Sequence, residues 1–419
     1  MDRPASRWAP VIGFVLASSA NQMAWLAFAP ITTGAAARYG VSNTTIGLLS
    51  EIFPLLYVLL AVPAGRAVDR SLRTWLAAGA VLGALGTVVR LGGANLFGAA
   101  GATGASGGGF AWVFAGQFMA AAAQPLLLNS VTALARGYLR PADRPFGISI
   151  ASAGTFLGFV LAFVTARTFG AGHLDLLLAL GAGYATLGAA VLVVALGRTP
   201  CLPTPEEVPA LVGGVAGGPV PVARDGVGEM RRLWADSVMR SLVWFVFVGF
   251  GVFVSLTTWV QPLLQPAGVS TADADTLLTF MVLAGMVSSA AFPPLVARRG
   301  LQLPALAAGG VATISGCSLL AAAPGVVSAA VALCLVGFFL LPGLPIVLEV
   351  AERRSGAGAG AGAGLLWMAG QAGGIVVAVV SGAAQGTPWL AFSALAAVVL
   401  AAVPLAGRLR GQLPSSLAG

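Results

Sequence analysis

Residues 65–73 read Gly-Arg-Ala-Val-Asp-Arg-Ser-Leu-Arg and form a charged segment between two long apolar runs. The run before it, 46–64, contains one charged residue, Glu51, and the run after it, 74–89, contains none. Three arginines and one aspartate cannot be left in hydrocarbon, because an unsolvated charge there is too costly. We therefore expect two membrane-spanning helices joined by a tight charged loop at the membrane surface.

The composition indicates a protein that crosses the membrane many times. Of its 419 residues, 58% are hydrophobic and 9% are charged, and the mean hydropathy is +0.92. A soluble chain cannot bury that much apolar surface. The net charge of +8 is carried by arginine alone, without any lysine. This excludes the lysine of an ATP-binding phosphate loop and the lysine of a Schiff-base enzyme.

The remaining composition argues against several other kinds of site. The arginines sit at the ends of apolar runs, which favours a role in membrane topology over nucleic-acid binding. Cys201, Cys317 and Cys334 lie far apart without a Cys-x-x-Cys pair, so we expect no disulfide framework and no metal site. The single histidine, His173, is interpreted as an interfacial residue. We expect no cofactor and no nucleic-acid partner.

The apolar runs predict an all-α membrane protein with about twelve spans of about 20 residues each. A stretch rich in proline and glycine, 198–237, separates two sets of six. We therefore expect an N-terminal six-helix bundle over 1–197, a cytoplasmic linker over 198–237 and a C-terminal six-helix bundle over 238–419. The expected spans are 8–34, 44–64, 74–93, 110–135, 146–168, 174–196, 242–264, 276–297, 303–322, 327–348, 365–384 and 388–406.

The arginines predict the orientation of these spans. With the N-terminus inside, nineteen arginines fall on the cytoplasmic side and three, Arg38, Arg90 and Arg167, fall outside. Cytoplasmic loops are enriched in arginine, so we expect both termini in the cytoplasm and the protein in the cell membrane.

The charged segment closely resembles the loop between helices 2 and 3 of the major facilitator superfamily. Gly65, Asp69, Arg70 and Arg73 fit that pattern, and Leu72 stands where a second glycine is usual. The resemblance implies two pseudo-symmetric six-helix bundles with a substrate site between them near the midplane. It also implies transport by alternating access.

Other residues resemble one branch of that superfamily, the feline leukaemia virus receptor-related family of heme and choline or ethanolamine transporters. The segment Asn21-Gln-Met-Ala-Trp25 carries part of this resemblance, and further matches are scattered over both halves. Members of that family are similar in placing an aromatic cage around a quaternary ammonium group. Trp25, Gln124 and Gln371 match elements of the cage, whereas Val254 stands where the helix 7 tyrosine is expected.

Each candidate residue has two possible roles, which are to line a cavity or to pack between helices. Asn21 and Trp25 share one face of a helix (i, i+4) in mid-membrane, which favours a cavity. Gln124 and Gln371 are either hydrogen-bonding links between helices or cavity residues. Trp259 and Trp367 are candidates to replace the missing tyrosine, with core packing as the alternative. We expect the site to be lined by Asn21, Trp25, Gln124, Trp259 and Gln371.

Two acidic residues have candidate roles in the transport cycle. Glu51 lies inside an apolar run, where a carboxylate is seldom idle. Its candidate roles are a substrate counter-charge, a proton-coupling site or an ion pair with Arg90, and the alternative is a hydrated position near the outer surface. Asp69 is expected to act in gating, by capping the N-terminus of helix 11 or by pairing with Arg136. We expect the gating set to be Gly65, Asp69, Arg70, Arg73 and Arg136.

Together these observations predict a secondary transporter that moves a small organic solute, such as a choline-like amine, by alternating access. The alternatives are a proton-coupled multidrug or metabolite exporter that uses Glu51, and a non-transporting membrane receptor or sensor. No His-Glu-x-x-His motif, Ser–His pairing or acidic metal cluster indicates an enzyme. We expect a monomer whose partners are a small-molecule substrate and the lipid bilayer.

Overall fold

The computed structural model describes residues 6–93, 108–199, 226–355, 359–384 and 386–410, and it confirms the expected all-α membrane fold. Eleven helices in these residues are long and apolar enough to cross a membrane. The twelfth expected span corresponds to α17 (Pro388–Arg410), whose apolar part covers Pro388–Ala402.

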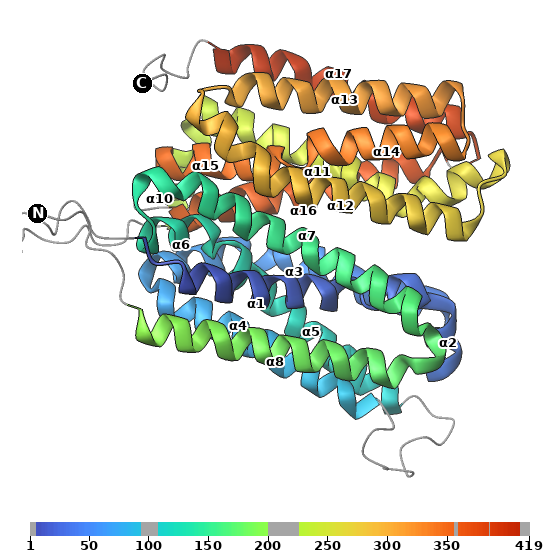
Figure 1. Ribbon diagram of the computed structural model, residues 1–419, viewed down its shortest axis with the longest axis horizontal. Coiled ribbons are helices and arrows are strands. Elements are labelled where there is room, and N and C mark those ends of the chain that lie inside the picture. Colours follow the sequence, from blue (N-terminus) through green and yellow to red (C-terminus); the bar gives the residue numbers. More distant parts are fainter. Residues whose placement is uncertain (1–5, 94–107, 200–225, 356–358, 385, 411–419) are drawn as a thin grey trace, which may run out of the picture.

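The helices fall into two sets that follow the chain order. The first six spans are α1 (Ala9–Leu26), α3 (Asn43–Arg70), α4 (Leu72–Val89), α5 (Gly108–Leu128), α7 (Arg144–Phe169) and α8 (Leu174–Arg198). The second six are α11 (Ser237–Leu264), α12 (Thr271–Arg298), α13 (Gln302–Ala322), α14 (Val326–Leu340), α16 (Ala359–Gly382) and α17. Figure 1 shows the first set in the lower half of the view and the second in the upper half. The two sets meet mainly where α7 packs against α12 and α3 packs against α16.

Three expected spans are interrupted in the structure. The first ends at Leu26 and continues through a 3-10 turn (Ala29–Ile31) into α2 (Thr32–Tyr39). The fourth breaks at Asn129 between α5 and α6 (Ser130–Tyr138). The tenth breaks at residues 341–342 between α14 and α15 (Gly343–Ser355). Pro30, Pro125 and Pro342 lie in or near these breaks, and proline disfavours a continuous helix because it lacks an N–H.

The charged segment is not the nine-residue loop that the sequence predicts. Helix α3 continues to Arg70, and only Ser71 separates it from α4. Gly65, Asp69 and Arg70 therefore occupy the last two turns of a helix. The prediction was wrong because a single glycine, Gly65, did not end the helix, and a helix carries charged side chains readily once it has left the hydrocarbon.

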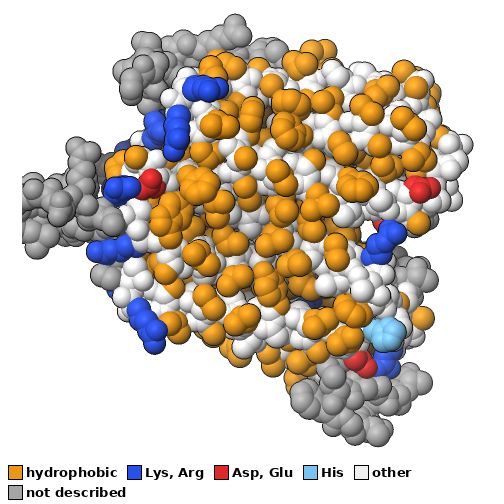
Figure 2. All heavy atoms as spheres, in the orientation of Figure 1, with side chains coloured by type: hydrophobic (Ala, Val, Ile, Leu, Met, Phe, Trp, Pro, Cys, Tyr) orange, Lys and Arg blue, Asp and Glu red, His pale blue; other side chains and the backbone are white. Residues whose placement is uncertain are grey.

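The surface is that expected of a protein surrounded by lipid. Figure 2 shows hydrophobic side chains spread over the middle of the molecule, with arginines gathered mainly at one end. On α3 the side chains of Leu48, Leu55 and Leu59 are each more than half exposed. We call the end that holds Arg70, Arg73, Arg140 and Arg144 the arginine-rich end.

The close packing of α11 on α16 gives a first testable prediction. A Cβ atom at Gly373 would lie 1.9 Å from the backbone oxygen of Phe247, whereas at Gly374 its nearest neighbour would be Val254 Cγ2 at 3.1 Å. We expect Gly373→Ala to destabilise the protein by about 1–3 kcal/mol, because backbone has to move. The matched variant Gly374→Ala should cost less, because a side chain can adjust. Thermal unfolding of the purified proteins measures both, and equal losses would contradict this packing argument.

Candidate functional site

A cluster of aromatic side chains lies where the two helix sets meet, and we call it the aromatic cluster. Its members come from α1, α3, α7, α11 and α16, and all but Phe250 are buried. They are Trp25, Phe53, Tyr57, Phe156, Phe159, Phe250, Phe253 and Trp367.

On the first set of helices the cluster is centred on Trp25. Its ring stacks on Phe53 of α3, with centroids 5.8 Å apart and an interplanar angle of 10°. It meets Phe159 of α7 at 5.6 Å and 70°, an edge-to-face geometry. Both arrangements are favourable for aromatic pairs. Phe159 then stacks on Phe253 of α11 at 6.3 Å, which carries the contact into the second set.

On the second set the contacts return to α3. The ring centroid of Phe253 lies 5.8 Å from that of Phe250, and the ring centroid of Phe250 lies 6.0 Å from that of Trp367 of α16. Trp367 lies 6.4 Å from Tyr57. Tyr57 stands one helical turn from Phe53 on α3, so the series of ring contacts begins and ends on α3 and passes through both helix sets.

The indole of Trp25 is held by a carbonyl that a proline leaves free. Trp25 Nε1 donates a hydrogen bond of 2.8 Å to the backbone oxygen of Ser50. In an uninterrupted helix that oxygen would accept from the N–H of residue 54, but Pro54 has none. Pro54 and Trp25 are thus coupled, and this contact fixes the orientation of the indole.

Buried amide side chains with unused hydrogen-bonding capacity lie in the same region. Asn21 donates to the backbone oxygen of Ala120 at 2.8 Å, while its Oδ1 has no partner among the described residues. Gln124 is fully buried, and neither of its side-chain polar atoms is bonded within the described part of the chain. Gln371 is 1% exposed, and no described residue bonds to its Nε2. Buried polar groups are costly unless satisfied, so these atoms are suited to meet a solute.

Gln124 on α5 and Gln371 on α16 lie at similar depth in the bundle. A Cβ atom at Gly364 would lie 3.0 Å from Asn129 Nδ2, so Gly364 and Asn129 lie at the same depth in the bundle. At 1.5 Å per residue, Gln124 stands about 7.5 Å along α5 from Asn129, and Gln371 stands about 10.5 Å along α16 from Gly364. The two helices run in opposite directions here, and Gln124 precedes Asn129 whereas Gln371 follows Gly364. Both glutamines therefore lie on the same side of the contact between Gly364 and Asn129.

Two sequence candidates lie apart from the aromatic cluster. Trp259 is half-buried near the end of α11, donates from Nε1 to the backbone oxygen of Ala378 at 2.7 Å and packs on Gly382. Glu51 is exposed and continues the outward stripe of Leu48 and Leu55 on α3. Residues three or four apart share a helix face, so Glu51 belongs to the face that meets lipid.

Arg90 does not pair with Glu51 within the described residues. It is 1% exposed, and its Nη1 donates to the backbone oxygen of Ala24 at 3.2 Å and to Gln117 Oε1 at 2.8 Å. Gln117 Nε2 in turn donates to the backbone oxygens of Ala24 and Leu49, each at 3.2 Å. This buried pair therefore links α1, α3 and α5.

Asp69 joins the two helix sets at the arginine-rich end. Its Oδ2 accepts from the backbone N–H of Ala361 at 2.9 Å, in the first turn of α16. The first N–H groups of a helix lack intrahelical acceptors, and the helix dipole favours an anion there. About two turns back along α3, Asn129 Nδ2 donates to the backbone oxygen of Ala61 at 2.8 Å, and Tyr57 donates to Asn129 Oδ1.

The other members of the expected gating set have separate surroundings. Arg73 donates to the backbone oxygens of Leu196 and Gly197 and so caps the end of α8. Arg70 is exposed, and Gly65 is buried within α3. Arg136 Nη1 is buried and forms no hydrogen bond with any described residue, and the charge of Arg136 acts on Glu352.

A second contact between the sets was missed in the sequence. Arg144 of α7 forms an ion pair with Glu352 of α15, with 3.1 Å between Nη1 and Oε1, and Glu352 is 4% exposed. A signal was present, because Glu349 and Glu352 are acids next to a long apolar run. Nearby, Asp236 pairs with Arg354 at 2.9 Å. Burial alone would raise the pKa of Asp236, but hydrogen bonds from Arg354 and the Val238 N–H hold it below its ordinary value.

Comparison with known proteins adds family evidence to this geometry. A family model described as Major Facilitator Superfamily matches residues 12–378. An uncharacterized protein of Archaeoglobus fulgidus is 30% identical over 134 residues, 32% of this chain and 62% of that protein. Solute carrier family 49 member A3 of Danio rerio is 26% identical over 284 residues, 68% of this chain and 57% of that protein. The match spans about three fifths of the length of each of these relatives.

Solved structures show a similar fold. The crystal structure of the Major Facilitator Superfamily transporter FucP in the outward conformation is similar with a TM-score of 0.68 and 16% identity. The match covers 95% of this chain and 99% of that one. At this identity the similarity concerns the fold alone.

Proposed function

From the premise that this chain belongs to the major facilitator superfamily, whose model matches residues 12–378, we propose that it moves a small organic amine by alternating access. It is a multi-pass membrane transporter and not an enzyme. The amine is the specific part of the proposal, and choline-like compounds are its first candidates.

The observation that carries the amine proposal is the aromatic cluster with its neighbouring free amides. A cation over an aromatic face gains about 0.5–2 kcal/mol, and more when it is desolvated. Trp25 and Trp367 belong to different helix sets, so a solute held between them would contact both. Gln124 and Gln371 offer polar atoms for a hydroxyl or ether group of the solute. Similarity to solute carrier family 49 member A3 supports the receptor-related branch.

We assign the alternating-access units to residues 1–197 and 238–419, with 198–237 as the linker. The packing of each helix set in Figure 1 supports this division, and residues 200–225 lie outside the described part of the chain. The distribution of arginines supports cytoplasmic termini in the cell membrane, with the arginine-rich end inside. We propose that the protein acts as a monomer, since the candidate site lies within one chain.

We propose that Asp69 and Glu352 hold the arginine-rich end closed. Each makes a contact from one helix set to the other, through Ala361 and Arg144 respectively. Opening this end would break both contacts. Arg136 adds positive charge beside Glu352, and Gly65, Arg70 and Arg73 would shape the helix end that carries Asp69.

The alternative of a proton-coupled exporter has less support from the position of Glu51. Its side chain lies on the lipid-facing stripe of α3, away from Phe53 and Tyr57. A coupling carboxylate has to sense both the solute and the conformational change. A proton gradient imposed on proteoliposomes tests this role, and solute flux that is indifferent to the gradient would remove it.

Ligand-induced stabilisation of Trp25 variants tests the amine proposal directly. We expect choline or tetramethylammonium to raise the unfolding temperature of the purified parent protein, because a ligand at a hundred times its Kd stabilises by about 2.7 kcal/mol. Trp25→Ala should weaken the apparent affinity about tenfold, through loss of the π face. Trp389→Ala is the matched control, since Trp389 is 60% exposed on α17. The proposal fails if neither amine stabilises the parent, or if both variants respond alike.

A further inference from the structure

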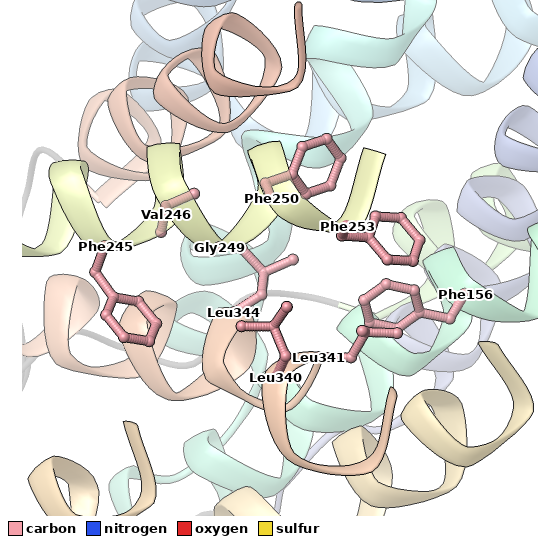
Figure 3. Close-up of a pocket in the computed structure, with 9 residues that line it drawn as sticks. All are labelled: Phe156, Phe245, Val246, Gly249, Phe250, Phe253, Leu340, Leu341 and Leu344. Atoms are coloured by element: carbon pink, nitrogen blue, oxygen red, sulfur yellow. The ribbon is translucent and has the colours of Figure 1, made fainter. Parts of the chain in front are cut away.

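An apolar pocket lies beside the aromatic cluster, between α11 and the break that separates α14 from α15 (Figure 3). It encloses about 390 Å³ of atom-free space, counting the part open to its surroundings. All the side chains around it are hydrocarbon, and one position has no side chain at all. The lining residues are Phe156, Phe245, Val246, Gly249, Phe250, Phe253, Leu340, Leu341 and Leu344.

Two local features of the sequence create this space. The backbone leaves its helical path at Pro342, so that Leu340, Leu341 and Leu344 point toward α11 from either side of the break. Opposite them, Gly249 has no side chain, and a Cβ atom there would lie 3.4 Å from Leu340 Cδ1. A larger residue at position 249 would therefore extend into the pocket.

The pocket continues directly from the proposed amine site. Phe156, Phe250 and Phe253 belong to both the pocket and the aromatic cluster. In Figure 3, Phe156 and Phe253 approach one another at one end of the pocket, and Phe245 lies toward the other end. A molecule with an ammonium group in the cluster can therefore place a second part of itself between α11 and the α14–α15 break.

We propose that this pocket is an apolar subsite that takes an alkyl or aryl arm of the transported solute. The substrate class is then amphipathic amines, with a cationic head in the aromatic cluster and a hydrocarbon arm against Gly249 and Leu344. This inference rests on the proposed amine transport. None of the side chains that line the pocket can form a hydrogen bond. A hydrophilic extension of the solute would therefore lose its hydrogen bonds to water there.

The physical gain of such an arm is predictable. Each methylene that moves from water into an apolar pocket improves affinity about fourfold. A dry apolar space also forfeits dispersion contacts on its lining, which an arm of matching shape restores. Affinity should therefore rise with arm length until the pocket is full and then level off.

A series of n-alkyltrimethylammonium ions tests the subsite on the full-length protein in lipid nanodiscs. Tetramethylammonium, butyltrimethylammonium and hexyltrimethylammonium differ only in the arm. We expect the butyl compound to bind the parent at least tenfold more tightly than tetramethylammonium. In Gly249→Val this gain should vanish, while tetramethylammonium binds as it does to the parent. Gly183→Val on α8 is the matched control, because a Cβ atom there meets nothing within 4 Å, and it should keep the gain.

A second variant tests the subsite if Gly249→Val does not fold. Leu344→Ala enlarges the pocket and should favour the hexyl over the butyl compound more strongly than the parent does. If Gly249→Val and Gly183→Val both bound the butyl compound more tightly than tetramethylammonium, as the parent does, the alkyl arm would be partitioning into lipid. That result would overturn the subsite. Equal affinity for all arms overturns the subsite alone, whereas failure of every compound to bind, tetramethylammonium included, overturns the amine site as well.

Discussion

Replacing Asp69 with alanine is expected to lower solute flux by about tenfold. The variant removes a helix cap worth about 0.5–2 kcal/mol, together with an anion at the positive end of the α16 dipole. The lost bond, from Ala361 N–H to Asp69 Oδ2, exists only when the ends of α3 and α16 meet. The loss therefore destabilises the state in which the arginine-rich end is closed. A destabilisation of about 1.4 kcal/mol changes the population of this state relative to the open state tenfold. Initial rates of solute uptake into proteoliposomes measure the effect.

Charge and geometry can be separated at the same position. Asp69→Asn keeps an oxygen that can cap α16 but removes the charge, so we expect a loss smaller than that of Asp69→Ala. The Arg144–Glu352 pair at the same end limits both losses, because it still holds the two sets together. Asp273→Ala is a control: this aspartate lies in the first turn of α12 and bonds to Ser270 within its own helix set. Flux through Asp69→Asn equal to that of the parent would contradict the gating role.

Arg90→Met is expected to cause the largest loss of stability among single substitutions in the first helix set. It leaves Gln117 Oε1 without its donor and removes one donor to the backbone oxygen of Ala24. Ala24 is among the last residues of α1, whose carbonyls have no intrahelical donor. Losing a hydrogen bond made by a charged group costs about 1.5–3 kcal/mol, and Arg90→Met loses two of them. Unfolding of the purified variant by heat or denaturing detergent measures the loss.

An exposed arginine is the control for this effect. Arg167 of α7 donates to Thr276 Oγ1 at 2.9 Å in an exposed position, and Arg167→Met should cost under about 1 kcal/mol. Gln117→Leu should destabilise strongly as well, and its effect should not add fully to that of Arg90→Met, because the two side chains share one bond. A stable Arg90→Met protein would show that the buried pair does not support the break after α1.

The aromatic site was only partly predictable. Trp25, Gln124 and Gln371 attract attention in the sequence because polar and indole groups in mid-membrane are unusual. Phe159 and Phe253 carry no such signal, since phenylalanine is ordinary in any membrane helix. Their roles depend on a contact between residues far apart in the chain. Glu51 shows the same limit: its periodicity with Leu48 and Leu55 is visible, but periodicity does not say whether that stripe faces lipid or a cavity.

The amino-acid sequence by itself determined where the chain crosses the membrane and where its charges gather, because hydropathy acts over one short segment at a time. Only the tertiary structure shows that α3 extends to Arg70, that Asp69 caps α16 and that Trp25 stacks on Phe53. It also opened the pocket beside Gly249. Each of these depends on how one helix faces another, and helix facing is set by packing between segments that no local pattern specifies.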